Sequence, residues 1–134
     1  MNKLFKKKEI FKVKSVPVNP DSMGEPKTVE ELQKRGIAYY ARNRYAQAEV
    51  DLQKAITIDA NNIDSYYSLG MVLKANNSKD AAVEAFKKVI ELIQSRSDAK
   101  EVKYHMLRRL ALGHVNELTQ GDWNLEKEIW KHIS

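Results

Sequence analysis

From Val29 to the end of the chain, apolar residues recur every three or four positions, which is the spacing of helices and not of strands. Short polar stretches such as "DANN" at 59–62 interrupt this pattern and predict turns. We expect helices at about 28–42, 45–58, 63–75, 79–94 and 98–118, and a short sixth helix ending near Ile133. Their short connections pair them into three antiparallel hairpins, which is an all-α fold.

Residues that favour helix starts precede three of these segments. Thr28 is expected to cap the first helix, and Glu31, three residues later, completes a capping box. Asn62 and Ser97 are the expected caps of the third and fifth helices.

All three prolines of the chain fall before the first helix, among residues that favour turns. This composition predicts a linker, because proline removes backbone donors and cannot continue a helix. We therefore divide the chain into a basic arm with a Pro-rich linker at 1–27 and a helical domain at 28–134.

The first two hairpins repeat each other at a fixed interval, which is the distance in sequence from Gly36 to Gly70. Small, large and turn residues all coincide at this interval, so an arbitrary bundle is a poor explanation of the pattern. The coinciding pairs are Gly36 with Gly70, Asn43 with Asn77, Ala48 with Ala82, and Leu52 with Phe86.

This period and its helix–turn–helix content resemble the tetratricopeptide repeat family. The first repeat, 29–62, reads Leu32-x2-Arg35-Gly36-x2-Tyr39, then Ala48-x3-Leu52 and Ala55. The second repeat, 63–96, reads Tyr66-x2-Leu69-Gly70-x2-Leu73, then Ala82-x3-Phe86 and Val89. The resemblance implies a right-handed α-solenoid of antiparallel helix pairs. The helix pattern and the charge distribution of this chain add about six helices and an extended basic N-terminal arm to that expectation.

The third pair departs from the period, because a strict repeat puts a glycine at position 104, where Tyr104 stands. The Leu112-Gly113 pair comes late by comparison, so we interpret 98–133 as a degenerate or capping pair with a lengthened first helix. Two partly separate apolar stripes support this interpretation. One holds Val102, Met106, Leu110 and Gly113, and the other holds Leu107, Ala111, Val115 and Leu118.

Charge is concentrated at the N-terminus, where residues 1–28 hold seven lysines and three acidic residues. The arm mixes these lysines with apolar residues, and three roles stay open for it. The first role is a solvated flexible arm, and the second is binding of anionic lipid or nucleic acid. The third is docking in the groove of the same molecule or of a neighbouring one. The lysines that an anionic surface would meet are Lys3, Lys6, Lys7, Lys8, Lys12 and Lys14.

Candidate chemistry is sparse. The chain has no cysteine, its three histidines are too scattered for a metal site and suit solvated or half-buried helix faces, and its five glycines form no phosphate loop. We therefore predict no enzyme, no metal and no cofactor. No apolar run is long enough for a signal peptide or a membrane span, so we expect a cytoplasmic protein.

The resemblance implies a concave groove lined by the first helix of each pair, which typically binds peptides. Carried onto this sequence, the groove residues are Gln33, Ile37, Tyr40, Ala41, Tyr67, Met71, Lys74 and Ala75. Tyrosine suits a half-wet contact, whereas Ile37 and Met71 equally suit packing between neighbouring first helices. Family members that hold acidic C-terminal tails use Lys and Asn here, so Gln33, Ile37 and Met71 favour an apolar ligand.

These features together predict a non-enzymatic protein–protein interaction module or adaptor that binds an apolar peptide. The alternative is a peripheral binder of anionic membrane or nucleic acid that works through the lysine arm. A homo-oligomer through the arm or the C-terminal helix is a further expectation, because Trp123, Trp130 and Ile133 cannot all face inward from a short helix.

Overall fold

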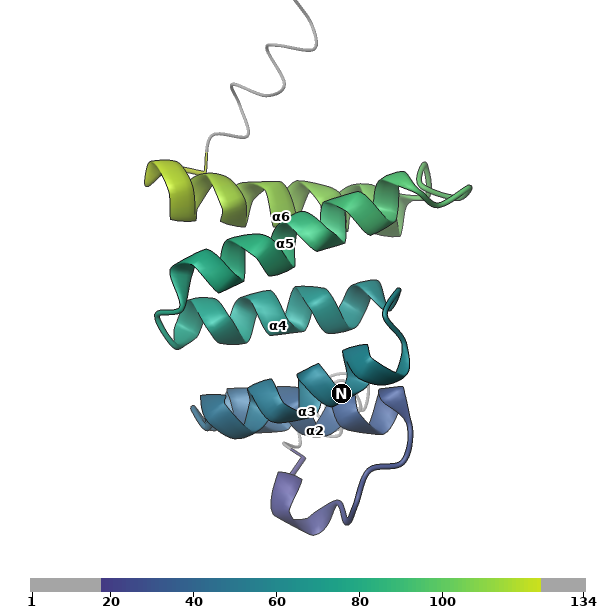
Figure 1. The fold of residues 1–134 in the computed structure, drawn as a ribbon, viewed down its shortest axis with the longest axis vertical. Coiled ribbons are helices and arrows are strands. Elements are labelled where there is room, and N and C mark those ends of the chain that lie inside the picture. The colour runs from purple at the N-terminus through teal and green to yellow at the C-terminus, as the bar shows by residue number, and fades with distance from the viewer. Residues whose placement is uncertain (1–17, 124–134) are drawn as a thin grey trace, which may run out of the picture.

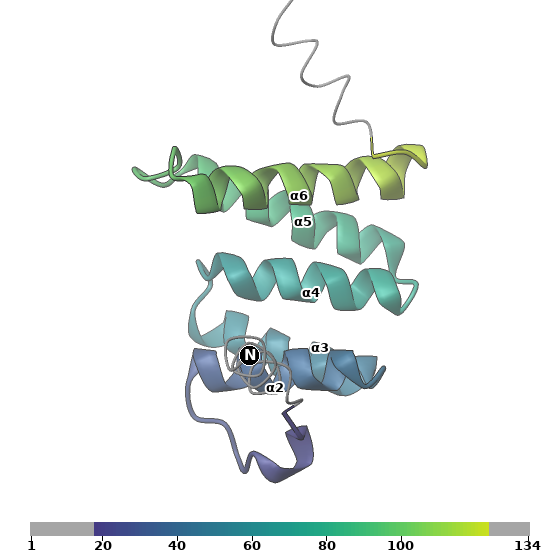
Figure 2. The ribbon, with the colours of Figure 1, turned by 180° about the vertical axis from the view of Figure 1, so that it is seen from behind.

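The computed structural model describes residues 18–123, and within this range every regular element is a helix (Figures 1 and 2). The prediction of an all-α fold is confirmed, whereas the expected sixth helix lies outside the described residues. A 3-10 turn, η1, precedes the helices. The elements are η1 (Pro20–Ser22), α2 (Val29–Ala41), α3 (Tyr45–Ile58), α4 (Ile63–Ala75), α5 (Lys79–Gln94) and α6 (Val102–Gln120).

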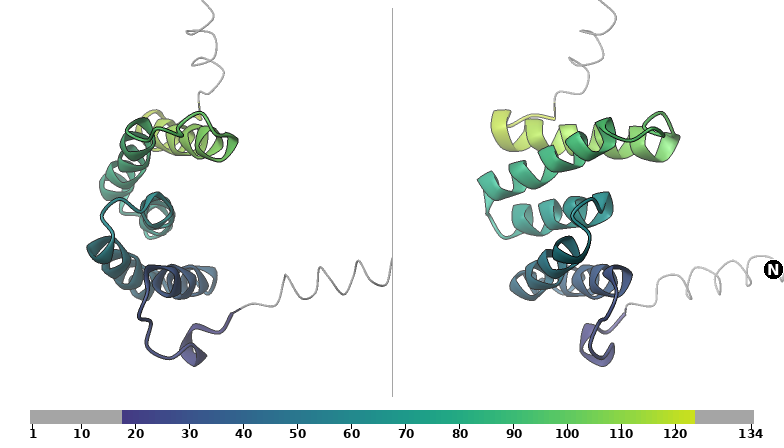
Figure 3. Two further views of the ribbon diagram at one scale, coloured as in Figure 1. Left: turned by 90° about the vertical axis from the view of Figure 1, so that its right-hand side faces the viewer. Right: turned by 45° about the vertical axis from the view of Figure 1, so that its right-hand side comes forward.

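The helices stack as hairpins in chain order. Helix α2 packs against α3, and α4 packs against α5, while α6 packs on α5. Figure 3 shows α2, α4 and α6 in one row, with α3 and α5 in a second row behind them. The first row is curved, so the described helices form the concave and convex faces of a short solenoid. None of them is long and apolar enough to span a bilayer.

The helix starts follow from side-chain caps. Thr28 Oγ1 accepts a hydrogen bond from the Glu31 backbone N–H at 3.1 Å, and Asn62 Oδ1 accepts from Ser65 N–H at 2.9 Å. Both caps were predicted. The capping box differs in one respect, because Glu31 Oε2 accepts from Lys27 N–H at 2.8 Å and not from Thr28 N–H. In the usual capping box the glutamate accepts from the N–H of the N-cap residue, whereas here it accepts from the residue before the N-cap.

The turns inside the two hairpins are built alike. Asn43 and Asn77, which occupy the same position in the two repeats, adopt left-handed backbone angles with φ of 61° and 62°. Asparagine tolerates this conformation better than most residues, because its short polar side chain adds little steric conflict. The coincidence of these two asparagines at the repeat period therefore corresponds to a turn geometry that both hairpins share.

The two repeat glycines lie at the closest approach within each hairpin. A Cβ on Gly36 would lie 3.0 Å from Leu52 Cγ, and a Cβ on Gly70 would lie 2.7 Å from Phe86 Cε1. Leu52 and Phe86 are both fully buried in one core that runs through α2 to α6. The small residue at each position leaves room for the large one, which is why the two types recur together.

An ion pair ties the first hairpin together. Asp51 is 1% exposed and accepts two hydrogen bonds of 2.8 Å from Arg35 Nε and Nη2. Arg35 Nη1 also donates to the carbonyl oxygen of Gly24 at 3.3 Å. Asp21 pairs with Arg44 at 2.9 Å. These two contacts therefore hold the linker residues 18–27 against α2 and α3.

The start of α6 corrects the sequence prediction. The helix begins at Val102 and not near Asp98, and Ser97 does not cap it. The Asp98 carboxylate is bound by the Arg96 guanidinium at 2.7 and 2.8 Å, and the Asp98 carbonyl accepts from Glu101 N–H. These bonds hold residues 97–101 as turns. Sequence periodicity could not show this capture of Asp98.

The two stripes of α6 have different environments. Leu107, Ala111, Val115 and Leu118 pack into the core. Val102, Met106 and Leu110, expected to support the capping pair, are instead exposed within the described residues.

Candidate functional site

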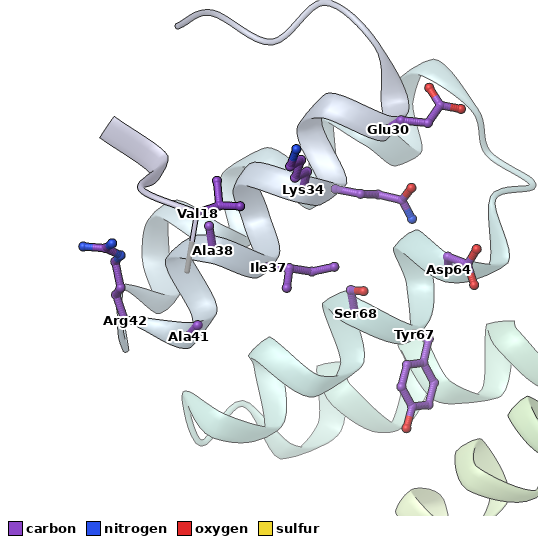
Figure 4. Close-up of a pocket in the computed structure, with 11 residues that line it drawn as sticks. Val18, Glu30, Lys34, Ile37, Ala38, Ala41, Arg42, Asp64, Tyr67 and Ser68 are labelled. Carbon is purple, nitrogen blue, oxygen red and sulfur yellow. The ribbon is translucent and has the colours of Figure 1, made fainter. Parts of the chain in front are cut away.

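The first helices of the two repeats enclose a groove. We name it the α2–α4 groove and define it by the residues that line it. Its volume is about 820 Å³. Figure 4 shows Ile37 of α2 and Ser68 of α4 pointing into the space between these helices. The lining residues are Val18, Glu30, Gln33, Lys34, Ile37, Ala38, Ala41, Arg42, Asp64, Tyr67 and Ser68.

Four of the residues predicted for the groove meet here, namely Gln33, Ile37 and Ala41 from α2 and Tyr67 from α4. Ile37 is 50% exposed, so packing between the first helices leaves half of its surface accessible. A half-exposed isoleucine on a concave wall has apolar surface to offer a ligand. Gln33 is more constrained, because its Nε2 donates to Asn62 Oδ1 at 3.1 Å.

A smaller hollow of about 130 Å³ continues the groove towards the core. It shares Ile37 and Tyr67 with the larger one and adds Tyr40 and Met71, two further predicted residues. Tyr40 and Met71 are half-buried against the core and are not sealed inside it. Six of the eight predicted residues therefore line one connected concavity.

Lys74 and Ala75 lie elsewhere. Ala75 is half-buried and lines neither hollow. Lys74 Nζ pairs with Glu117 Oε1 of α6 at 2.6 Å and lies 3.2 Å from His114 Nδ1. The pKa of Glu117 is lowered, chiefly by its hydrogen bond from Lys74. Lys74 therefore bridges α4 to α6.

The sequence-based prediction for His114 was wrong about its burial. It is 7% exposed and stacks on Phe86 with ring centres 4.5 Å apart. Its Nε2 lies 3.2 Å from the Tyr67 hydroxyl. Burial lowers the pKa of His114, and the charge of Lys74 lowers it further, while Glu117 opposes both. Burial also raises the pKa of Tyr67.

The hydrogen bonds around His114 fit a neutral ring. The Lys74 ammonium can only donate, so Nδ1 accepts from it and the ring proton lies on Nε2, facing the Tyr67 oxygen. His114 was predicted to be a solvated or half-buried surface residue. It lies in helical register with Leu107, Ala111 and Leu118, and this register was a signal that it belongs to the buried face.

The groove also has a charged rim that the prediction did not include. Glu30, Lys34, Arg42 and Asp64 line the larger hollow. Glu30 and Asp64 are related by the repeat period, and so are Lys34 and Ser68, so the period could have identified them. Val18 could not have been found in this way, because it comes from the linker and reaches α2 only through tertiary folding.

Several other predictions lie outside the described residues. These are the arm lysines Lys3, Lys6, Lys7, Lys8, Lys12 and Lys14, and also Trp130, His132 and Ile133. Within 18–123, no group of three His, Cys, Asp or Glu residues is placed to hold a metal ion.

Comparison with known proteins bears on the repeat region. Residues 36–77 match a family model described as TPR repeat, and residues 63–96 match one described as tetratricopeptide repeat. A search of curated proteins returned no match.

Proposed function

We propose that the protein is a non-enzymatic interaction module whose α2–α4 groove binds an apolar peptide segment of another protein. The matches of residues 36–77 and 63–96 to tetratricopeptide repeat models support this proposal. Repeats of this family generally mediate protein–protein interactions. The observation that carries the proposal is Ile37, half exposed on the wall of a hollow of about 820 Å³ that lies between two helices.

The chemistry of the groove favours an apolar side chain with polar flanks. Ile37, Ala38, Ala41 and Tyr67 supply the apolar wall, whereas the rim carries two acidic and two basic side chains. A balanced rim gives no strong preference for a charged ligand. Apolar burial supplies about 25 cal/mol per Å², so one well-seated leucine or phenylalanine is worth roughly 2 kcal/mol.

Lys74, the one basic residue predicted for the groove, lines neither hollow and is not free to bind a terminal carboxylate there. Its ammonium is already bonded to Glu117 and His114, so a ligand carboxylate would have to displace Glu117. We infer that the ligand is an internal apolar segment, helical or extended, and that Tyr40 and Met71 adapt to its side chain at the inner end of the groove.

Two matched surface substitutions test the groove. A library of random peptides displayed on phage is selected against the full chain, and the recovered peptides are measured by calorimetry. Ile37→Glu should weaken binding by tenfold or more, because it places a charge on the apolar wall. Val50→Glu is the control, since Val50 is 53% exposed on α3 and lines neither hollow of the groove.

The same peptides separate this proposal from binding through the lysine arm. Apolar binding in the groove should change little between about 50 and 200 mM salt, whereas binding of polyanions by six lysines should fall steeply. Equal affinities for Ile37→Glu and Val50→Glu, or selection of no apolar peptide at all, would refute the groove proposal.

A further inference from the structure

Tyr67 connects the α2–α4 groove to helix α6. Its ring lines both hollows of the groove, and none of the residues that line these hollows comes from α6. Figure 4 shows the Tyr67 hydroxyl pointing away from Ile37. That hydroxyl lies 3.2 Å from His114 Nε2. A groove residue is therefore bonded to a helix that takes no direct part in the groove.

Two contacts set the position of the Tyr67 ring. The ring lies edge-on to Phe86, with ring centres 5.7 Å apart, and its hydroxyl meets His114 at the far end. A tyrosine on a helix has few staggered side-chain positions, and each carries the ring to a different place. Because Tyr67 is only half-buried, close packing alone does not select among them. The bond at the hydroxyl does so.

His114 is fixed in the core by aromatic contacts and by Lys74. It is 7% exposed and stacks on Phe86 with ring centres 4.5 Å apart, and Trp123 lies edge-on to it at 4.9 Å. Its Nδ1 lies 3.2 Å from Lys74 Nζ, which can only donate, so the ring proton lies on Nε2 and faces the Tyr67 oxygen. The tautomer that Lys74 imposes is therefore the one that can donate to Tyr67.

We propose that His114 is a positioning residue of the α2–α4 groove. By donating from Nε2 to the Tyr67 hydroxyl, it holds the ring as the wall on which an apolar side chain of the ligand packs. The inference rests on the proposed peptide-binding function, and it adds to that function a residue that touches no ligand. Lys74, which was predicted to contact the ligand, acts instead through His114.

Ligand binding should then depend on pH. A second proton on His114 can enter only at Nδ1, the nitrogen that faces the Lys74 ammonium at 3.2 Å. Two cations at that distance repel, and a charged imidazole is poorly stabilised in so buried a position. The ring therefore moves towards water and away from Tyr67. Tyr67 itself stays a neutral hydroxyl, because burial raises its pKa.

The charged groups beside His114 act in opposite directions, since Lys74 of α4 disfavours the imidazolium and Glu117 of α6 favours it. The side chains that it meets from α5 and from the chain after α6, Phe86 and Trp123, are uncharged. Burial is the largest cause, and the pKa of His114 lies below its ordinary value of 6.5. A ligand that needs the neutral ring lowers this pKa further. Affinity should therefore be constant above about pH 6.5 and fall as the pH drops below it.

Substitutions at both ends of the bond test this role in the full chain. The probes are apolar peptides without Asp, Glu or His, selected on phage against the wild-type protein. Binding is measured by calorimetry at about pH 7.5, at a temperature where circular dichroism shows every variant folded. Tyr67→Phe keeps the ring and removes the hydroxyl, and His114→Leu removes the donor. Each should weaken binding about threefold to tenfold, the range for one lost neutral hydrogen bond. The double variant should lose little more than either single one, because both remove the same bond.

Two further variants separate positioning from a general effect on the fold. His114→Gln keeps an N–H donor without a titrating group, so it should bind within about twofold of wild type and show no loss between about pH 6.5 and 5. His105→Leu is the matched control, since His105 is exposed on the same helix and lines neither hollow. It should keep the affinity and the pH profile of wild type.

The outcomes separate the positioning role from the groove itself. If Ile37→Glu weakens binding but Tyr67→Phe and His114→Leu leave it unchanged, the groove stands and the positioning role is wrong. Losses that add in the double variant, or a pH dependence that persists in His114→Gln, would overturn that role as well. If no peptide is selected, or if Ile37→Glu has no effect, both the groove and the positioning role are refuted.

Discussion

Replacing Gly70 by alanine should destabilise the protein, although alanine is the better helix former. The new Cβ would lie 2.7, 2.8 and 2.9 Å from three ring carbons of Phe86. Phe86 is fully buried, and its ring is packed between Tyr67 and His114 at centroid distances of 5.7 and 4.5 Å. The ring cannot rotate away from the added methyl group without displacing these neighbours.

Two opposing effects set the magnitude. Alanine in place of glycine favours a helix interior by about 1 kcal/mol. An extra methyl group in a packed core costs about 1–3 kcal/mol, and three contacts below 3.0 Å place Gly70 at the upper end of that range. We therefore expect a net loss of about 2 kcal/mol in the free energy of unfolding. At Gly36 the neighbour is Leu52, at 3.0 and 3.3 Å, and the two effects should nearly cancel.

Chemical denaturation of wild type, Gly70→Ala and Gly36→Ala measures these differences, with the m-values compared to confirm a common unfolding transition. The equivalent of Phe86 in the first repeat is Leu52, so Phe86→Leu gives both repeats the same residue at this position. Adding it to Gly70→Ala should recover about 1 kcal/mol relative to additive behaviour, because leucine leaves room for the methyl group. A neutral or stabilising Gly70→Ala, or strictly additive changes in the double variant, would refute the packing argument.

Two other perturbations have definite expectations. Asp51→Asn should cost about 3 kcal/mol in thermal or chemical denaturation, because it leaves Arg35 facing a neutral partner in a buried pair; a loss below about 1 kcal/mol would contradict the role given to this pair. His114 has a pKa below its ordinary value of 6.5 in the folded state, so the unfolded chain takes up the proton first. Stability should be full above about pH 6.5 and fall as the pH drops below it, and His114→Gln should flatten that part of the profile in denaturation midpoints; an unchanged profile would count against His114 as its source.

Much of the repeat region could be predicted from the sequence because its determinants are local. The bounds of α3, α4 and α5 match the predicted ranges, and Thr28 and Asn62 cap their helices as expected. Helix periodicity and caps depend on residues three or four positions apart. The repeat period also placed Gly36 with Gly70 and Leu52 with Phe86, and the structure adds that each glycine packs on the large residue of its own hairpin.

The candidate site was predictable only in part. Six of the eight groove residues line the hollow because helical phase fixes which face of α2 and α4 they occupy. Lys74 was placed on the correct helix, but its bridge to Glu117 depends on where α6 lies. No residue near Lys74 in the sequence reports that position.

The sequence by itself determined the helices of the first two hairpins, their turns and the face that each helix turns to the groove, because all of these follow from contacts within a single repeat or between adjacent ones. Tertiary structure alone decided the partners that come from farther along the chain. It brought Val18 to the groove and buried His114 against Phe86. It also left Met106 exposed while Leu107, one residue on, packed into the core. Which of two apolar stripes a helix buries depends on the shape of the surface it meets, and that surface exists only once the chain has folded.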